Sequence, residues 1–361
     1  MANSVISTAN TVEQWQKAVY VESIRANEFM PYMGRTLDKA IYINEDLGAK
    51  PGQAITMSLI GRLSGDPVVN DDTLLGNEEE VYNSGHKIEV SQWRKAISIG
   101  TYEEGKTHLE LLNKGGPLLR DWLADLVRNH IISALGSACI DGVTPYASCT
   151  EAQKDAWVAA QYAADRVLFG AAVSNYSASD HSASLLNVDS TTDVLSTGIV
   201  SLARRVAERR VAGKLALTPI NGLKSVPAKY VMFVPSVAMR DLRTSMTTPL
   251  EYAGPRSNSN PLFAAGDLLW DGVVVHEVPE ISTISGVGAA SIDVAPCYLI
   301  GQQAVGMAVG QRAAAIKEKT DYENIRGTGI KQVHGIEKLM TEDSGVQIGV
   351  MTVYVSGVAD T

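Results

Sequence analysis

Apolar side chains between residues 117 and 141 recur in two neighbouring rows with four-residue spacing. The rows are Leu118, Trp122, Leu126, His130, Ala134 and Leu119, Leu123, Val127, Ile131, Leu135. Such rows share one stripe of an α-helix, and Pro117 suits the first helical position after a break at Gly115–Gly116. Because each four-residue step drifts by about 40°, the stripe winds around the helix. The pattern predicts a spine helix from Pro117 to Asp141, about 37 Å long, that crosses several other elements.

Alternating apolar and polar residues predict two strands that flank a long loop. The alternation covers residues 54–63 and 86–100, with Ile88 and Val90 on one face of the second strand and Trp93 on the other. The connection contains the acidic, turn-rich stretch LSGDPVVNDDTLLGNEEEV (63–81). Loops of this length are uncommon in compact domains and usually have a function. The sequence therefore predicts a long hairpin excursion.

The remaining patterns indicate an α+β protein. Residues 1–50 predict an extended arm with a weak amphipathic helix, and residues 142–190, rich in Ala, Ser and Asn, predict variable loop with a short helix. A second amphipathic helix is expected over 194–212, and a short one from Ser236. Strands are expected over 230–234, 272–278, 297–309, 327–340 and 346–358.

Composition narrows the class of protein. The chain has 361 residues, 45% hydrophobic and 20% charged, which is typical of a globular protein. No secretory signal pattern and no apolar run of membrane-spanning length is present. The three cysteines include no C-x-x-C pair, so a disulfide framework is improbable and a reducing cytoplasm fits better. The net charge of -9 is the reverse of the basic surplus typical of free nucleic-acid binding.

Motifs for chemistry are missing from the sequence. It has no P-loop, no nucleophile elbow and no histidine or cysteine spacing of a zinc site. Gly327, Gly329 and Gly335 do not fit a dinucleotide fingerprint and are interpreted as strand or bulge glycines. Cys139 and Cys149 are interpreted as buried, inert thiols. We therefore expect no catalytic residues, no cofactor and no metal.

Charge is unevenly distributed along the chain. Residues 66–90 carry seven acids against Lys87 alone, and residues 200–214 carry five basic residues against Glu208. Each cluster alone is compatible with a solvated surface, a helix-dipole effect or an i,i+4 pair. Together they suggest that the acidic loop lies across the basic helix of a neighbouring copy. The candidate inter-subunit residues are Asp66, Asp71, Asp72, Glu78, Glu79, Glu80, Trp93, Arg94, Arg204, Arg205, Arg209 and Arg210.

Several stretches resemble the major capsid proteins of tailed phages, in the family typified by phage N-four. Besides 63–81 they are SQWRKAI (91–97), NSNPLFAAGDLLWDGVVVHEV (258–278), CYLIGQQAVGMAVG (297–310), YENIRGTGIKQVHGIEKLM (322–340) and GVQIGVMTV (345–353). They occur in the family's order and span most of residues 50–355. Residues 142–190 match the family least.

The resemblance implies the Hong Kong 97-like capsid fold. Its expected parts are an N-terminal arm (1–50), an extended hairpin called the E-loop (51–100), the spine helix and peripheral domain (101–145), an axial domain (146–300, with a possible insertion at 146–190), and peripheral-domain strands with the C-terminus (301–361). The stretch 63–81 would then be the tip of the E-loop, which reaches over an adjacent subunit.

The resemblance also implies a function. The chain would self-assemble through hexamers and pentamers into an icosahedral head, with portal, scaffolding or decoration proteins as further partners. The head would enclose double-stranded DNA without sequence-specific binding, and no membrane is involved. The protein would be made in the host bacterial cytoplasm and reside in the virion. The alternatives are an encapsulin-like compartment shell and a soluble enzyme whose site the motif search missed.

Overall fold

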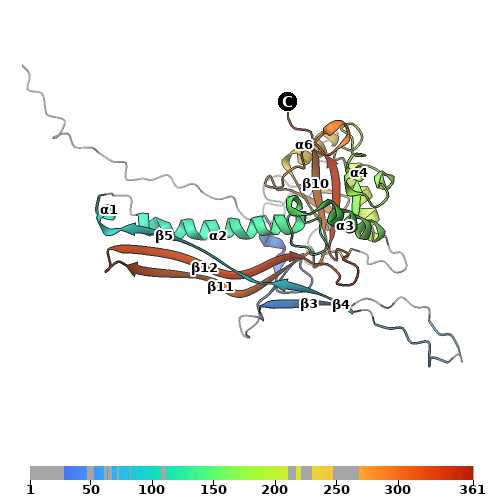
Figure 1. Ribbon diagram of the computed structural model, residues 1–361. Coiled ribbons are helices and arrows are strands. Elements are labelled where there is room, and N and C mark those ends of the chain that lie inside the picture. Colours follow the sequence, from blue (N-terminus) through green and yellow to red (C-terminus); the bar gives the residue numbers. More distant parts are fainter. Residues whose placement is uncertain are drawn as a thin grey trace, which may run out of the picture. The chain divides into compact units, whose positions relative to one another are not determined.

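The computed structural model describes residues 28–46, 53–60, 63, 67–70, 73–81, 83–106, 111–209, 217–220, 230–246 and 268–360, with only the backbone for 111–114 (Figure 1). The described chain divides into two compact units. The first unit contains the described parts of Gln92–Leu126 and Arg312–Gln332. The second unit contains those of Asn27–Ser91, Val127–Gln311 and Val333–Thr361.

Helices and strands alternate irregularly along the described chain, as expected for an α+β protein. The α-helices are α1 (Thr101–Lys106), α2 (Leu111–Gly136), α3 (Glu151–Ala163), α4 (His181–Leu185), α5 (Thr197–Glu208) and α6 (Ser236–Ser245). The strands are β1 (Met33–Gly34), β2 (Ile41–Asn44), β3 (Ala54–Ile60), β4 (Asn83–Glu89), β5 (Ser91–Gly100), β6 (Val167–Phe169), β7 (Tyr230–Val234), β8 (Leu268–Trp270), β9 (Val273–Glu277), β10 (Val294–Ile300), β11 (Val305–Thr320), β12 (Ile325–Lys338) and β13 (Val350–Ser356).

A six-stranded sheet in the order β6-β13-β10-β7-β9-β8 forms the centre of the second unit. Its neighbouring inner strands β10 and β13 are antiparallel and buried at every position. Alternate residues of β7 face different cores, because side chains alternate across a strand. Met232 packs with the core beneath α5 and α6, whereas Phe233 packs in the core that contains the end of α2.

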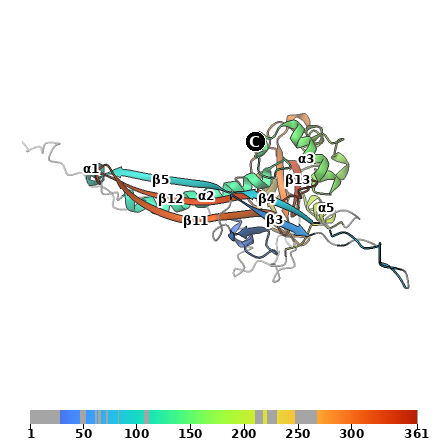
Figure 2. The same ribbon diagram turned by 60° about the horizontal axis from the view of Figure 1, so that its bottom comes forward.

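Helix α2 is the predicted spine helix, and its residues are divided between the two units. In the first unit, Leu119 and Leu123 pack on Ile330 of β12, and the helix runs along β5 and β12 (Figures 1 and 2). In the second unit, Ile131 and Leu135 are fully buried in the core around Phe233. The winding stripe therefore contacts successive elements, as its drift predicted.

The predicted start and end of the spine helix were wrong. Helix α2 begins at Leu111, so Pro117 lies inside it, and it ends at Gly136 rather than Asp141. Gly115 does not break the chain but lies within the helix, next to Ile97 of β5.

Two predicted strands are each divided between sheets. The segment 86–100 forms β4 and β5, which separate at Val90, where the chain leaves the β3–β4 ribbon for the sheet β1-β2-β11-β12-β5. The segment 297–309 likewise divides into β10 and β11. An uninterrupted apolar pattern cannot show where a strand changes its pairing partner.

Residues 142–190 are more ordered than the sequence indicated. Helix α3 has 13 residues and a capping box between Thr150 and Gln153, and Trp157 on it is fully buried. Strand β6 extends the central sheet by pairing in parallel with β13. The prediction of variable loop with a short helix therefore found a helix but missed β6 and α4, because short buried elements are hidden by small residues.

The described part of the N-terminal segment belongs to the second unit. Phe29 is fully buried with its ring centroid 4.6 Å from that of Phe233, and β2 pairs in parallel with β11. Most of the predicted arm and of its amphipathic helix lies outside the described residues.

Cys139 and Cys149 form a disulfide with a Cα–Cα distance of 6.3 Å. This corrects the interpretation of both residues as inert thiols. The pairing depends on the turn between α2 and α3, which the spacing of three cysteines could not show. Cys297 is a free, buried cysteine on β10.

A buried guanidinium ties α2 to two other segments of the second unit. Arg128 is 2% exposed, and its Nε lies 3.3 Å from a carboxylate oxygen of Glu28. Nη2 of the same guanidinium pairs with the Glu280 carboxylate. Removal of one partner from a buried pair costs stability because a charge is left without compensation.

Arg128→Met should lower the free energy of unfolding by about 2 kcal/mol, since the two glutamates remain partly solvated. Chemical denaturation of the purified protein measures this change. The control is Arg326→Met, whose ion pair with Glu104 is long and exposed, and we expect a change below about 0.5 kcal/mol for it. Equal effects of the two substitutions would contradict this role for Arg128.

Candidate inter-subunit surfaces

The β3–β4 ribbon carries the predicted E-loop. The strands pair antiparallel from Ala54↔Glu89 to Ile60↔Asn83, so residues 61–82 connect them beyond the last pair, and the structure describes residues 63, 67–70 and 73–81 of this excursion. This confirms the long hairpin that the alternating pattern indicated. The ribbon is visible in Figures 1 and 2.

The base of the ribbon is firmly attached to the second unit. Ile55 and Ile88 are buried against residues of β11 and the end of β12. The Glu337 carboxylate accepts from the Glu89 backbone N–H at 3.1 Å and lies 3.1 Å from Nε2 of His86. The base of the ribbon is therefore fixed on the second unit.

The outer turn of the excursion is formed by Leu74, Leu75, Gly76 and Asn77. The Asn77 N–H donates to the Leu74 carbonyl at 3.0 Å, and Gly76 has φ +91°. A positive φ at the third residue is typical of a type II turn and favours glycine there. The Glu78 carboxylate accepts from the Gly76 N–H at 2.7 Å. The turn is thus held by its own hydrogen bonds.

The excursion displays more apolar surface than its acidic sequence suggested. Leu75 is 83% exposed and Leu74 64% exposed. Other large apolar side chains exposed on or beside the excursion are Ile60, Leu63, Val69 and Val81. Sequence reasoning missed these residues because it treated the stretch as a charge cluster; the L-L-G-N turn was the available signal. Large exposed apolar side chains in one segment mark an interaction surface.

The acidic candidates lie on the same excursion. Glu78, Glu79 and Glu80 are exposed along an extended stretch after the turn. Asp66, Asp71 and Asp72 lie outside the described residues. The acids that the structure describes therefore directly follow the apolar turn.

The basic helix is largely engaged within its own subunit. Arg204 on α5 pairs with Glu208 at 3.3 Å and with Asp271. Arg209 makes two hydrogen bonds, of 2.7 and 3.1 Å, to the Asp165 carboxylate, and these bonds raise the pKa of Arg209. Pairing of either arginine with a neighbour would compete with these internal contacts.

The other candidates differ in how they are placed. Arg205 is exposed on α5 and makes no ion pair within the described part of the chain. Arg94 is exposed on β5, and Trp93 beside it is half-buried. Arg210 lies outside the described residues. Arg205 and Arg94 are thus the exposed basic candidates without an ion pair among the described residues, whereas Arg204 and Arg209 have partners in their own subunit.

The histidines that the structure describes have structural partners. The rings of His130 on α2 and His334 on β12 lie 3.2 Å apart between Nδ1 and Nε2, and His276 contacts the Tyr32 hydroxyl. Among the described residues no cluster of histidine, cysteine or acid side chains has the arrangement of a metal site. No helix within the described ranges is long and apolar enough to span a bilayer.

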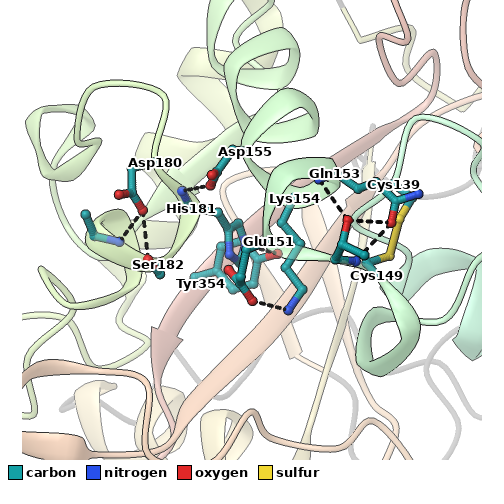
Figure 3. Close-up of polar contacts among 12 residues, drawn as sticks. Cys139, Cys149, Glu151, Gln153, Lys154, Asp155, Asp180, His181, Ser182 and Tyr354 are labelled. Carbon is teal, nitrogen blue, oxygen red and sulfur yellow. Dashed lines mark hydrogen bonds and ion pairs between the residues drawn. A yellow bond between two sulfur atoms is a disulfide. The ribbon is translucent and has the colours of Figure 1, made fainter.

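His181 on α4 lies inside an aromatic cluster of the second unit. It is 1% exposed, and its Nε2 lies 3.4 Å from the Tyr354 hydroxyl (Figure 3). Its backbone N–H donates to Asp155 at 2.8 Å, while Lys154 pairs with Glu151 nearby. Burial, and then the Lys154 charge, lower the pKa of His181 to about 4. The ring is therefore neutral at physiological pH and acts as a core residue.

Known proteins match this chain over nearly its whole length. The sequence model of the family described as "Phage capsid protein" matches residues 3–358. The major capsid protein of Pseudomonas phage KPP25 is 25% identical over 328 residues, which is 84% of each chain.

Solved structures agree with this match. The cyanophage Pam1 capsid subunit is 29% identical with a TM-score of 0.86, and the Ralstonia phage GP4 capsid subunit is 19% identical with a TM-score of 0.76; both matches cover 100% of each chain. The fold is thus the Hong Kong 97-like capsid fold that the resemblance implied. The chain belongs to the phage capsid protein family.

Proposed function

We propose that this chain builds the icosahedral head of a tailed phage through overlapping contacts, with the 61–82 excursion of each copy lying on the next copy. Its family establishes a structural protein of the virion that self-associates into a shell, not an enzyme. The observation that carries the proposal is the exposed Leu74–Leu75 turn at the end of a firmly based ribbon.

Energetic reasoning supports this use of the excursion. Ordering each residue costs about 1–2 kcal/mol in backbone entropy. Leu74 and Leu75 stay mostly exposed on their own subunit. Burial of the two leucines on a neighbouring copy would offset part of this entropy cost, at about 25 cal/mol per Å² of apolar surface.

The acids beside the turn would act differently from the leucines. Charge complementarity mainly sets orientation and partner choice. We propose Arg205 and Arg94 as the basic partners on the neighbouring copy, because both are exposed. A head-to-tail contact of this type closes into rings and shells.

The remaining partners follow from the same function. Portal, scaffolding or decoration proteins would complete the head, and double-stranded DNA would fill it. The net charge of -9 suits a container that should not adhere to its cargo, because binding to DNA depends on phosphate neutralisation by basic side chains.

Electron microscopy and sedimentation of the purified protein test the proposal directly. We expect hollow shells, or pentamers and hexamers that convert into shells. A protein that stays monomeric, with or without added scaffolding protein, would overturn it.

Glu78→Lys/Glu79→Lys/Glu80→Lys should abolish regular shells but leave the subunit folded. The substitution changes the local charge from negative to positive at residues whose side chains are exposed, while the buried base of the ribbon is untouched. Sedimentation and microscopy measure assembly, and circular dichroism measures folding.

The neutral triple variant Glu78→Gln/Glu79→Gln/Glu80→Gln is the matched control. It removes the charges without reversing them, and we expect shells at reduced yield. Leu74→Ser/Leu75→Ser tests the apolar contribution separately. Normal shells from the lysine variant would exclude pairing through the acids, whereas normal shells from the serine variant would exclude the turn as an anchor.

A further inference from the structure

The segment between α2 and α3 is closed by the Cys139–Cys149 disulfide. Cys139 lies three residues after the end of the spine helix, and Cys149 precedes Thr150, the N-cap residue of α3. Figure 3 shows the bond beside the first turn of α3. The bridge therefore connects the end of one helix to the start of the next.

Non-covalent contacts fix the same segment independently of the bridge. The Asp141 carboxylate accepts from the backbone N–H groups of Val143 and Thr144, each at 3.1 Å. The capping box orients Thr150 and Gln153. The same contacts would hold the two cysteines near each other in a chain with free thiols.

Lys338 of β12 holds the segment from the opposite side. It is fully buried, its Nζ donates to the Ser137 carbonyl at 2.7 Å, and its backbone N–H donates to the Gly142 carbonyl at 2.9 Å. These contacts come from an element distant in sequence. The positions of the two sulfur atoms are thus set by the tertiary fold.

Cys139 and Cys149 are both nearly buried, at 2% and 6% exposed, and Cys139 lies at the wall of a hollow. Cys139 lines a solvent-open hollow of about 270 Å³, together with Ile140, Asp141, Ala152, Gln153 and Ala156. Cys297, by contrast, is fully buried, and burial raises the pKa of its thiol. A buried thiol of raised pKa is a poor nucleophile, so it would not compete in exchange. Exchange with a small reagent would therefore join Cys139 to Cys149 and leave Cys297 as a free thiol.

We propose that Cys139 and Cys149 remain thiols while the head assembles inside the cell and form the disulfide after release. The inference rests on the proposed function, because phage heads assemble in a cytosol that keeps thiols reduced and then persist in an oxidising medium. The bond would strengthen the finished particle at the end of the spine helix without taking part in assembly.

A low-molecular-weight disulfide is the oxidant. A thiolate, at Cys139 because it lines the hollow, attacks one sulfur of the reagent, and the first small thiolate leaves. The Cys149 thiolate then attacks the Cys139 sulfur of the mixed disulfide, and the second small thiolate leaves. The protein loses two electrons and two protons, and the reagent becomes two thiols.

The test uses shells purified under reducing, oxygen-free conditions and oxidised glutathione as the reagent. Alkylation after denaturation, read by mass spectrometry, should modify three cysteines before oxidation and only Cys297 afterwards. The shells should stay intact, and their melting temperature should rise by several degrees. A reducing agent should reverse the rise.

Variants separate the bridge from other effects. Cys139→Ser/Cys149→Ser should assemble normally and show no redox-dependent melting, whereas Cys297→Ala should keep the full response. Three results would overturn the proposal: a complete bridge in shells trapped with acid inside unlysed cells, Cys139 and Cys149 still free after oxidation, or failure of the double variant to assemble. If wild-type chains formed no shells in either redox state, the proposed function would fail, and alkylation of the soluble subunit would still decide the thiol chemistry.

Discussion

Replacement of Gly335 by alanine should destabilise the second unit by roughly 3 kcal/mol, and replacement by valine by more. A Cβ built at Gly335 on β12 would lie 1.9 Å from the Glu89 carbonyl oxygen and 2.9 Å from its carbonyl carbon. These are backbone atoms, so the conflict cannot be relieved by rotating a side chain. The Glu89 N–H is itself bonded to Glu337, which further limits movement of β4.

Urea denaturation of the purified subunit measures this effect, and the yield of soluble protein gives a second reading. The matched control is Gly116→Ala in helix α2, where a Cβ meets nothing within 4 Å. We expect the control to stabilise the protein by about 0.5–1 kcal/mol, because alanine favours helix over glycine. Wild-type stability of Gly335→Ala would show that β12 and β4 do not approach this closely.

Gly335 illustrates which features a sequence pattern can predict and which it cannot. The strand pattern correctly suggested a strand glycine rather than part of a nucleotide site, because the glycine spacing did not fit a fingerprint. The reason for the glycine, however, is a backbone 246 residues away at Glu89. Periodicity describes local structure, and it cannot report a close approach between distant segments.

The spine helix and the long hairpin were predictable for a related reason. Each depends on a repeat within one segment: the drifting i,i+4 rows of α2 and the alternation on either side of the acidic loop. The change of sheet at Val90 and the Cys139–Cys149 pairing depend on tertiary partners. For that reason the sequence pattern did not contain them.

The candidate contact surface was predictable only in part. Glu78, Glu79 and Glu80 are exposed, but Arg204 and Arg209 have partners in their own subunit. Asp271 and Asp165, which hold them, are distant in sequence. Charge counting finds clusters, but it cannot show which charges are already neutralised within the fold.

Burial of His181 in the aromatic cluster should make the free energy of unfolding depend on pH. In the folded state the pKa of His181 is lowered to about 4, first by burial and then by the Lys154 charge, against an ordinary value of 6.5. His334 is also lowered to about 4, by burial and then by His130. Charged groups around His181 are Lys154, Glu151, Asp155 and Asp180. The acids favour its protonation, but burial outweighs them.

The sign of the effect follows from proton binding. Between pH 6.5 and pH 4 the unfolded chain binds a proton at His181, whereas the folded chain does not. Unfolding is therefore increasingly favoured as pH falls through this range. The contribution of His181 to the free energy of unfolding is largest above pH 6.5, falls as the pH is lowered, and becomes constant below pH 4. A shift of this size corresponds to roughly 3 kcal/mol.

Acidification from pH 7 to pH 4 should thus lower the free energy of unfolding of the purified subunit by roughly 3 kcal/mol through His181, with a further loss through His334. His181→Phe should remove the first contribution, since phenylalanine suits the aromatic surroundings of Phe169 and Tyr354 and cannot be protonated. His181→Gln should also flatten the pH dependence but start from a lower stability at pH 7. Urea denaturation at half-unit pH intervals measures all three proteins. An equally steep decline in both variants would show that His181 is not a source of the acid sensitivity.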